Sequence, residues 1–281
     1  MKLTVLIILN IFLVNCYSYC QPSEEYLEAN DDSISLVQIV TDSLFNSHQR
    51  INLLTIDKED LNSYRFEFAY QTSELKKTSQ IAESRNAIAA INGSFFDMDK
   101  GGSVSYFEVN DSVISRTRST GLKWSVPDSL INGALVLNKN NILEIETASK
   151  ELVYEGSFSE TFVMISGPLL INNSMAQRLP DMNFTNKRHP RTCVGITKNA
   201  IILITIDGRS EQAEGMNLAE VQKYLLDLGC TEAINLDGGG STCMWTKDMG
   251  VVNIPSNKTG ERPVANALLI LKNENAQTSN Y

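Results

Sequence analysis

Residues 233–241 read AINLDGGGS, and they join a predicted buried strand to a glycine-rich turn. The strand is expected to end at Asp237, which three glycines follow directly. Glycine tolerates positive φ and lets a ligand approach the backbone, and successive N–H groups in such a turn converge on an anion. A carboxylate beside an anion-binding turn indicates a site for charged groups. A tight turn with a solvated Asp237 is the alternative that this stretch alone leaves open.

The composition is that of an ordinary globular protein with a full core. The chain has 281 residues, of which 42% are hydrophobic and 20% are charged. Its net charge is −9 and no run rich in Lys and Arg occurs. These features argue against nucleic acid and against an acidic membrane surface as partners. An anionic substrate stays open, because a local pair of arginines can outweigh the overall field.

The N-terminus has the pattern of a targeting segment. Lys2 supplies a positive charge, residues 3–14 are largely apolar, and polar residues follow. That apolar run is too short to span a bilayer well, so it predicts a secretory signal peptide. Cleavage near Cys20 would leave an exported protein that begins near Gln21. Lipid attachment at Cys16 is the alternative. No other segment is long and apolar enough for a transmembrane span.

A single α+β domain, with a mixed β-sheet core and a few packed helices, is the predicted architecture, because no internal repeat or separating linker occurs. The predicted divisions are a signal peptide (1–20), a polar leader with the first strand (21–50), the main domain (51–271) and a tail (272–281). Three cysteines of the mature chain lack zinc-ligand spacing and are expected to be buried core residues: Cys193, Cys230 and Cys243.

Hydrophobic periodicity predicts the main elements. Alternation of aromatic and polar residues over 64–70 indicates a half-buried strand, and the continuous apolar run 200–206 indicates a fully buried one. Asn217 and Glu220 form a capping-box pair that begins a helix, and Gly229 ends it. A helix is also expected over 73–85, a loop over 172–187, and further strands at 34–40, 51–56, 87–91, 104–109, 112–114, 134–137, 142–145, 161–165 and 264–271.

Polar residues and a glycine follow several of these strands. Asn92 and Gly93 come after 87–91, and Asp207 comes after 200–206. The strand that ends before Asp207, the helix and the strand that ends before Asp237 make a parallel-type connection, which brings both carboxylates to one edge of a sheet if the strands are neighbours. His189, flanked by two arginines, is either an anion contact or part of a solvated basic turn.

Six sequence blocks carry a resemblance to a known family. They are residues 90–96, 191–195, 207–209, 215–218, 234–241 and 262–264, in that order. Between about Ile51 and Leu271 the chain resembles the phosphodiester glycosidase family, as a bacterial and exported relative. The resemblance implies hydrolysis of the anomeric C–O bond of a sugar-1-phosphodiester, which gives a free sugar and a phosphomonoester. One departure is Ser94, where the best-known member has an acid.

The resemblance suggests roles for the conspicuous residues. A phosphate ester leaves without protonation, so the protein must mainly hold the phosphate charge and direct a base or nucleophile at the anomeric carbon. Asp237 and Asp207 suit the second task, with Glu211 in reserve. Phe95 and Phe96 are expected in the core more than as a sugar platform. Residues expected to bind substrate or phosphate are Asn92, Gly93, Arg191, Arg209, Asn235, Gly238, Gly239, Gly240, Ser241 and Arg262.

Two other classes of function stay open at this point. A metal-dependent phosphodiesterase would cut the P–O bond and hold a hard cation through oxygens of Asp207, Asp237, Asn92 and Asn235. A non-catalytic carbohydrate-binding envelope protein would keep the pocket without the acid that Ser94 replaces. The sequence requires no cofactor, although a divalent cation is an alternative. The expected partner is a phosphorylated glycan or a sugar-1-phosphodiester.

Overall fold

The structure is a computed structural model that describes residues 25–31, 34–118 and 127–273. The predicted signal peptide, its cleavage site, Cys16 and tail residues 274–281 lie outside these residues, so export stays a prediction. Within the described ranges, no helix combines the length and the apolar character needed to cross a membrane.

An eight-stranded sheet in the order β1-β2-β3-β14-β13-β15-β11-β12 forms the centre of the molecule. The continuous apolar sequence of β14 is explained by the burial of both of its faces. Leu203 packs into one hydrophobic cluster, and Ile202 and Ile204 pack into another. The strands are β1 (Glu25–Asp31), β2 (Ile34–Thr41), β3 (Gln49–Asp57), β11 (Leu169–Asn172), β12 (Met175–Ala176), β13 (Arg191–Thr197), β14 (Ala200–Ile206) and β15 (Cys230–Asn235).

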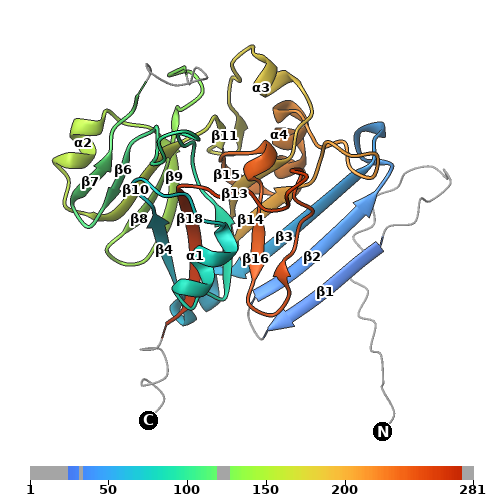
Figure 1. The fold of residues 1–281 in the computed structure, drawn as a ribbon, viewed down its shortest axis with the longest axis horizontal. Helices are drawn as coiled ribbons and strands as arrows, with labels where there is room; N and C mark the ends of the chain where they lie inside the picture. Colours follow the sequence, from blue (N-terminus) through green and yellow to red (C-terminus); the bar gives the residue numbers. More distant parts are fainter. Residues whose placement is uncertain (1–24, 32–33, 119–126, 274–281) are drawn as a thin grey trace, which may run out of the picture.

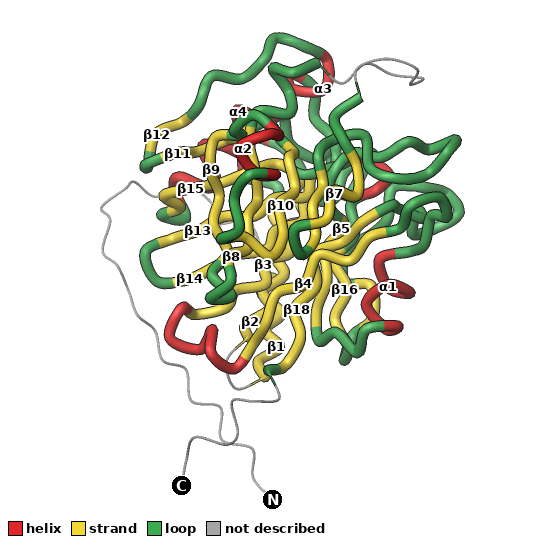
Figure 2. Tube along the Cα trace, turned by 90° about the vertical axis from the view of Figure 1, so that its left-hand side faces the viewer, coloured by secondary structure: helices red, strands yellow, loops and turns green. Residues whose placement is uncertain are grey.

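Two five-stranded sheets complete the β structure, in the orders β7-β6-β10-β8-β9 and β17-β16-β5-β18-β4 (Figures 1 and 2). The first contains β6 (Phe107–Val109), β7 (Ser112–Ser115), β8 (Gly133–Asn138), β9 (Leu143–Thr147) and β10 (Glu160–Ser166). The second contains β4 (Tyr64–Tyr70), β5 (Ala89–Asn92), β16 (Met244–Thr246), β17 (Gly250–Val251) and β18 (Asn266–Lys272).

Short helices and 3₁₀ turns lie between the strands. The α-helices are α1 (Thr78–Ser84), α2 (Glu151–Glu155), α3 (Asn183–Asn186) and α4 (Leu218–Asp227), and the 3₁₀ turns are η1 (Leu44–Asn46), η2 (Lys58–Ser63) and η3 (Gly239–Ser241). The predicted capping box of α4 is confirmed. The Asn217 side chain accepts from the Glu220 N–H at 2.9 Å, and Glu220 Oε2 accepts from the Asn217 N–H at 3.0 Å.

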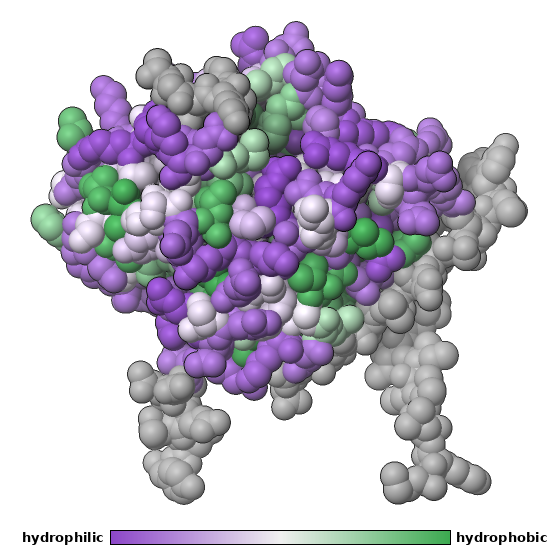
Figure 3. Space-filling model, in the orientation of Figure 1, coloured by the Kyte–Doolittle hydropathy of each residue, from purple (hydrophilic) through white to green (hydrophobic). Residues whose placement is uncertain are grey.

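The hydrophobic core is layered between the sheets. One cluster joins the central sheet to both smaller sheets, and it includes Leu54, Phe68, Leu135 and Ile234. A second cluster packs α4 on the opposite face of the central sheet. Polar side chains cover most of the face in Figure 3, where apolar residues form only scattered patches. The prediction of a single α+β domain is therefore confirmed, and the three cysteines, all of them free, are buried as expected.

The structure differs from the sequence expectations in the pairing of the strands. Every strand pair in the described ranges is antiparallel, and β13 lies between β14 and β15. The sheets are therefore antiparallel and not mixed as expected, and the expectation that β14 and β15 could be parallel neighbours is also wrong. Both still run antiparallel to β13, so their carboxyl ends lie at the same sheet edge, two strand spacings or about 10 Å apart.

Several element boundaries also differ. β1 lies within the segment expected to be a polar leader, because it pairs along β2. The helix expected over 73–85 begins only at Thr78, since residue Lys76 bridges to Val264. α3 falls inside the loop expected over 172–187. Short elements of this kind have too few residues for a periodic pattern to reveal them.

Candidate functional site

A cavity of ≈ 220 Å³ opens where β15 ends and β13 begins. Its size is below the usual range for drug-sized ligands, so it suits one compact ligand group. Cationic, anionic and apolar side chains meet there within a small volume. The lining residues are Phe95, Phe96, Met98, Phe184, His189, Arg209, Asp237, Gly238, Gly239, Gly240 and Arg262.

Two of the three glycines make room for two arginines. Gly239 has φ +61°, and a Cβ there would lie 2.8 Å from Arg209 Nη2. A Cβ on Gly240 would overlap the Arg262 guanidinium. The turn therefore needs glycine because guanidinium groups rest against its backbone. It is less open to an anion than the sequence suggested, because the Gly239 N–H already donates to Pro190 O at 2.8 Å.

Asp237 is held by its backbone and presents its carboxylate to the cavity. Its N–H donates to Gly93 O at 3.0 Å, and its carbonyl accepts from Asn92 Nδ2 at 2.6 Å. Burial raises the pKa of Asp237 to about 6, while Ser241, the Arg262 charge, the Gly238 N–H and the Arg209 charge act against that rise. A buried carboxyl with a raised pKa beside a cavity is a candidate for general acid–base catalysis.

Arg209 and His189 form one wall of the cavity. Arg209 has φ +64°, which is unusual for a residue with a side chain and is typical of strained functional positions. Its Nη2 lies 3.5 Å from His189 Nδ1. Burial lowers the pKa of His189 to about 4, and the charges of Arg191, Arg209 and Lys187 contribute to this shift. His189 is therefore neutral near pH 7, and its ring can donate or accept a hydrogen bond without adding a positive charge to the site.

Arg262 reaches the cavity from the loop before β18. Its Nη1 donates to Ser241 Oγ at 3.4 Å, and its Nη2 donates to Asn257 Oδ1 at 3.3 Å. Ser241 also supports the Asp237 carboxylate by a side-chain hydrogen bond. Two guanidinium groups and a carboxylate are thus positioned together on the glycine turn. Such a pair of arginines is suited to a phosphate group.

The remaining wall is apolar. Phe95 and Phe96 are buried, as expected for core residues, and they line the inner part of the cavity. The Phe184 ring meets the Phe95 ring edge-on at 5.8 Å between centroids, and Met98 is 50% exposed. An apolar surface opposite charged groups fits a ligand that has both a hydrocarbon face and an ionic group.

Asp207 does not line the cavity. Its side chain is buried, where Oδ2 accepts from the Ile254 N–H at 3.1 Å and lies 3.4 Å from Arg50 Nε. Burial raises the pKa of Asp207 to about 7, although the Ile254 N–H and Arg50 act against the rise. The structure therefore places Asp207 apart from the cavity, where its carboxylate anchors the chain around Ile254. The intervening β13 separates it from Asp237.

Glu211 and Arg191 also lie apart from the cavity. Glu211 is exposed on a turn that the Ser210–Ala213 bridge closes. Arg191 is fully buried: its guanidinium donates to the carbonyl oxygens of Met216, Phe184 and Lys187 at 2.7–2.9 Å and stacks on the Phe184 ring at 4.9 Å. Arg191 thus positions the segment that carries Phe184 and His189, and it does not line the cavity.

The predicted amide residues hold the frame of the site. Asn92 Oδ1 accepts from Thr192 Oγ1 and the Cys243 N–H, while Asn235 Nδ2 donates to Gly167 O and Leu236 O. Gly93 has no room for a side chain, because a Cβ would overlap Asn266.

Asn92 and Asn235 were considered with Asp207 and Asp237 as a divalent-cation set, and both amide side chains are hydrogen-bonded to protein groups. In the described residues no cluster of three or more His, Cys, Asp or Glu side chains is arranged as a metal site. Ser94, where the sequence departs from the family, is buried, and its Oγ bonds to Ser105 Oγ and Ile165 O at 2.9 Å each.

Sequence reasoning missed two residues of the cavity, Phe184 and Met98. Both lie in segments without a periodic pattern, and they reach the cavity only through the fold. A single aromatic residue in the polar stretch 172–187 was the one available signal. His189 was recognised as a candidate, and the structure places it on the cavity wall.

Comparison with known proteins assigns the chain to a family. The sequence profile described as phosphodiester glycosidase matches residues 85–271, which is more than half of the chain. The chain belongs to the phosphodiester glycosidase family.

Curated relatives support the assignment. The chain is 30% identical over 188 residues to human N-acetylglucosamine-1-phosphodiester alpha-N-acetylglucosaminidase, in an alignment that covers 62% of this chain and 34% of the human protein. It is 34% identical over 86 residues to the uncharacterised prophage-derived protein YomE of Bacillus subtilis, which covers 30% of this chain and 13% of that protein. The chain thus spans about a third of the length of the human relative it matches.

Solved structures share the fold. The zebrafish N-acetylglucosamine-1-phosphodiester alpha-N-acetylglucosaminidase catalytic domain, auto-inhibited by its pro-peptide, aligns with a TM-score of 0.63 at 21% identity, over 89% of this chain and 88% of that one. A hypothetical protein from Synechocystis aligns with the same TM-score at 16% identity, over 89% of this chain and 64% of that one. At these identities the likeness concerns the fold.

The electrostatics of the cavity predict an unusual titration for His189. Its imidazole should remain neutral down to a midpoint near pH 4, because burial and nearby cations disfavour the charged ring. In Arg209→Gln the midpoint should rise, since one of those cations is removed. NMR titration of the two histidines, with His189→Gln for assignment, measures both values. A midpoint near 6.5, the ordinary value for His, would contradict the geometry.

Proposed function

We propose that this protein hydrolyses the bond between the anomeric carbon of a sugar and the oxygen of a phosphodiester. The observation that carries the proposal is the convergence of the Asp237 carboxylate with Arg209 and Arg262 on one glycine turn, in a chain of the phosphodiester glycosidase family. N-acetylglucosamine is the sugar in the names of the curated relatives. We extend that substrate class to this chain as part of the proposal.

The leaving group determines how the charges are used. A phosphate ester departs as an anion, so the site must stabilise negative charge on the phosphate oxygens as the C–O bond breaks. Arg209 and Arg262 supply donors in fixed fork geometry for this purpose. His189 adds a neutral ring beside Arg209. The apolar wall with Phe184 and Met98 faces the space that we assign to the sugar.

Asp237 acts at the anomeric carbon in this proposal. As a base it would activate a water molecule, and as a nucleophile it would form a glycosyl intermediate that water then hydrolyses. Both roles need the ionised carboxylate, and neither needs a second carboxyl group to protonate the departing phosphate. This agrees with the positions of Asp207 and Glu211, which do not line the cavity.

Hydrolysis in oxygen-18 water tests which bond is cut. With a sugar-1-phosphodiester as substrate, we expect the label in the released sugar, because water or Asp237 attacks the anomeric carbon. Mass spectrometry of both products measures the position of the label. Label in the phosphate would instead show P–O cleavage by a phosphodiesterase, and absence of product would favour a binding protein. The Asp237→Asn variant is the control for turnover at this site.

The two arginines should act on the phosphate selectively. Arg209→Ala and Arg262→Ala should each lower kcat/KM for the phosphodiester by ~10²-fold, the scale for loss of one transition-state donor. The loss should be smaller on an aryl glycoside of the same sugar, which has no phosphate to hold. Asp237→Asn should impair both substrates alike. Steady-state kinetics on the two substrates measures these effects.

A matched control for the arginine variants is Arg65→Ala, since Arg65 is exposed on β4 and pairs only with Glu67 among the described side chains. It should leave both activities unchanged. Equal losses on both substrates for Arg209→Ala and Arg262→Ala would show that these residues shape the cavity without binding the phosphate.

The pH dependence should follow Asp237. Since the ionised carboxylate is the active form, kcat/KM should rise with pH and level off above an apparent pKa near 6. Below that value it should fall about tenfold per pH unit, as protonation removes the base or nucleophile. A pH–rate profile, with circular dichroism as a folding control at each pH, measures this limb. Activity that falls as the pH rises through this range would assign Asp237 as a general acid instead.

A further inference from the structure

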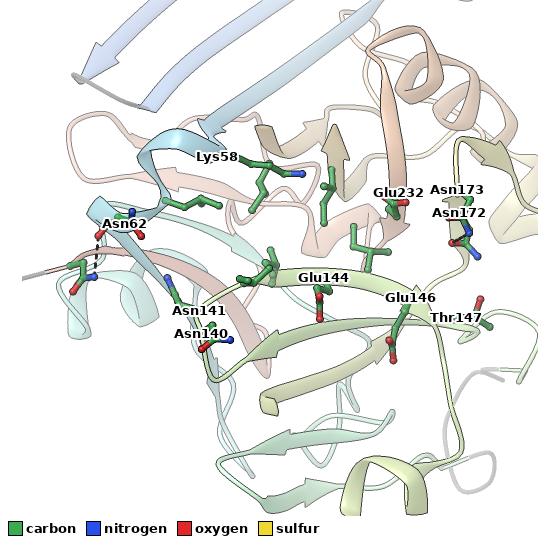
Figure 4. Close-up of a pocket in the computed structure, with 17 residues that line it drawn as sticks. Lys58, Asn62, Asn140, Asn141, Glu144, Glu146, Thr147, Asn172, Asn173 and Glu232 are labelled. Atoms are coloured by element: carbon green, nitrogen blue, oxygen red, sulfur yellow. Dashed lines mark hydrogen bonds between the residues drawn. The ribbon is translucent and has the colours of Figure 1, made fainter. Parts of the chain in front are cut away.

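A larger cavity of ≈ 970 Å³ opens at the opposite end of the central strands (Figure 4). Ile196, near the end of β13, and Glu232, near the start of β15, both line it, whereas Asp237 follows the other end of β15. At about 3.3 Å per residue along a strand, the two cavities are separated by roughly 20 Å. They share no lining residue, so this cleft is distinct from the proposed catalytic site.

One side of the cleft is formed by the edge of β9. Residues 140–147 all line it, without a gap. A strand that showed only a face to a cavity would contribute every second residue, because side chains alternate between faces. The unbroken run therefore means that the cleft meets the strand along its edge. β9 is also the terminal strand in the order of its sheet.

The hydrogen bonds at the two ends of β9 show which backbone groups face the cleft. Ile142 accepts from β8 through its carbonyl, and the Ala148 N–H donates to the segment before β8. Because bonded and non-bonded pairs alternate in an antiparallel ladder, the even-numbered residues of β9 bond toward β8. The N–H and C=O groups of Leu143, Ile145 and Thr147 therefore point to the open side.

The edge of the neighbouring sheet, which is formed by β4, is covered by a side chain. On β4, the Asn141 side chain accepts from the Phe66 N–H at 3.1 Å and donates to the Tyr64 carbonyl at 2.9 Å, which covers that edge. In the described ranges no strand is hydrogen-bonded to the outer edge of β9. An open edge beside a cleft of this size is a template for an added strand. We propose that the cleft binds an extended peptide that pairs with β9.

The side chains of the cleft indicate the chemistry of that peptide. Side chains of an added strand would alternate between two faces. One set would lie on the same face as Leu143 and Ile145 and contact an aliphatic floor, and the other would lie on the same face as Glu144 and Glu146. Lys58 and Glu232 lie across the cleft from β9 (Figure 4). Three carboxylates against one ammonium leave a net charge of −2 in the lining. The aliphatic residues of the floor are Leu61, Leu143, Ile145, Ile196 and Ile201.

The preferred occupant is therefore a polypeptide segment in which apolar and basic residues alternate. Opposite charges on directly facing strand positions stabilise the pair, and like charges destabilise it. None of the lining residues is aromatic, so the floor suits aliphatic side chains better than flat rings. The occupant is thus a partner distinct from the proposed sugar phosphate, and the inference does not depend on the proposed function.

Amide hydrogen exchange tests the mode of binding. On addition of a short peptide of alternating valine and lysine, the amides of Leu143, Ile145 and Thr147 should exchange at least ~10-fold more slowly, because they gain hydrogen-bond partners. Those of Glu144 and Glu146 should change little, since they already bond toward β8. Exchange that stays unchanged at the odd-numbered residues would overturn the proposal. Protection there in the free protein would also overturn it, by showing that residues of this chain already cover the edge.

Charge reversal tests the specificity. The double variant Glu144→Lys/Glu146→Lys should bind the valine–lysine peptide ~10-fold or more weakly in fluorescence anisotropy, because two attractive cross-strand pairs become repulsive. The same variant should instead bind a valine–glutamate peptide. The matched control is Glu83→Lys/Asp248→Lys, which changes the net charge equally at exposed positions outside the cleft. Equal weakening by both double variants would overturn the proposal, because the attraction would then be unspecific. Hydrolase activity should be unchanged in either variant.

Discussion

The buried carboxamide of Asn92 is the contact on which the proposed site depends. Its Nδ2 donates to the Asp237 carbonyl at 2.6 Å, and its Oδ1 accepts from Thr192 and from the Cys243 N–H. These groups belong to different sheets, so one fully buried side chain fixes where the sheets meet. Leaving such groups unpaired would cost about 1–3 kcal/mol each, which makes this arrangement strongly favoured over alternatives.

The same meeting point concentrates charge in a small, partly desolvated volume. Burial makes ionisation of Asp237 harder, and the arginines resting on the glycine turn make it easier. The balance leaves a carboxylate that ionises near neutrality beside groups that can hold an anion. Arg209 is kept in a left-handed conformation to achieve this, and such strain persists where the surrounding structure enforces it. Fold and proposed chemistry are thus linked through the residues after β15.

Much of the fold was predictable from local patterns. The strands β4 and β14 have the predicted bounds, because alternation and continuous apolar character report directly on whether one face or both are covered. The capping box of α4 was also predictable, since it depends on residues three positions apart. Strand order was not: β13 inserts between β14 and β15, and this pairing depends on contacts between residues distant in sequence.

The sequence by itself determined the family blocks, a buried strand shortly before Asp237 and the glycine-rich turn that follows it. Only the tertiary structure decided which charged residues share a cavity. Arg191 and Arg209 look equivalent in sequence, yet Arg191 is buried against backbone carbonyls while Arg209 is exposed at the site. Asp207 and Asp237 both follow apolar strands, but only Asp237 faces the cavity. The physical reason is that a side chain's surroundings are set by long-range strand pairing and packing, which local sequence patterns do not encode.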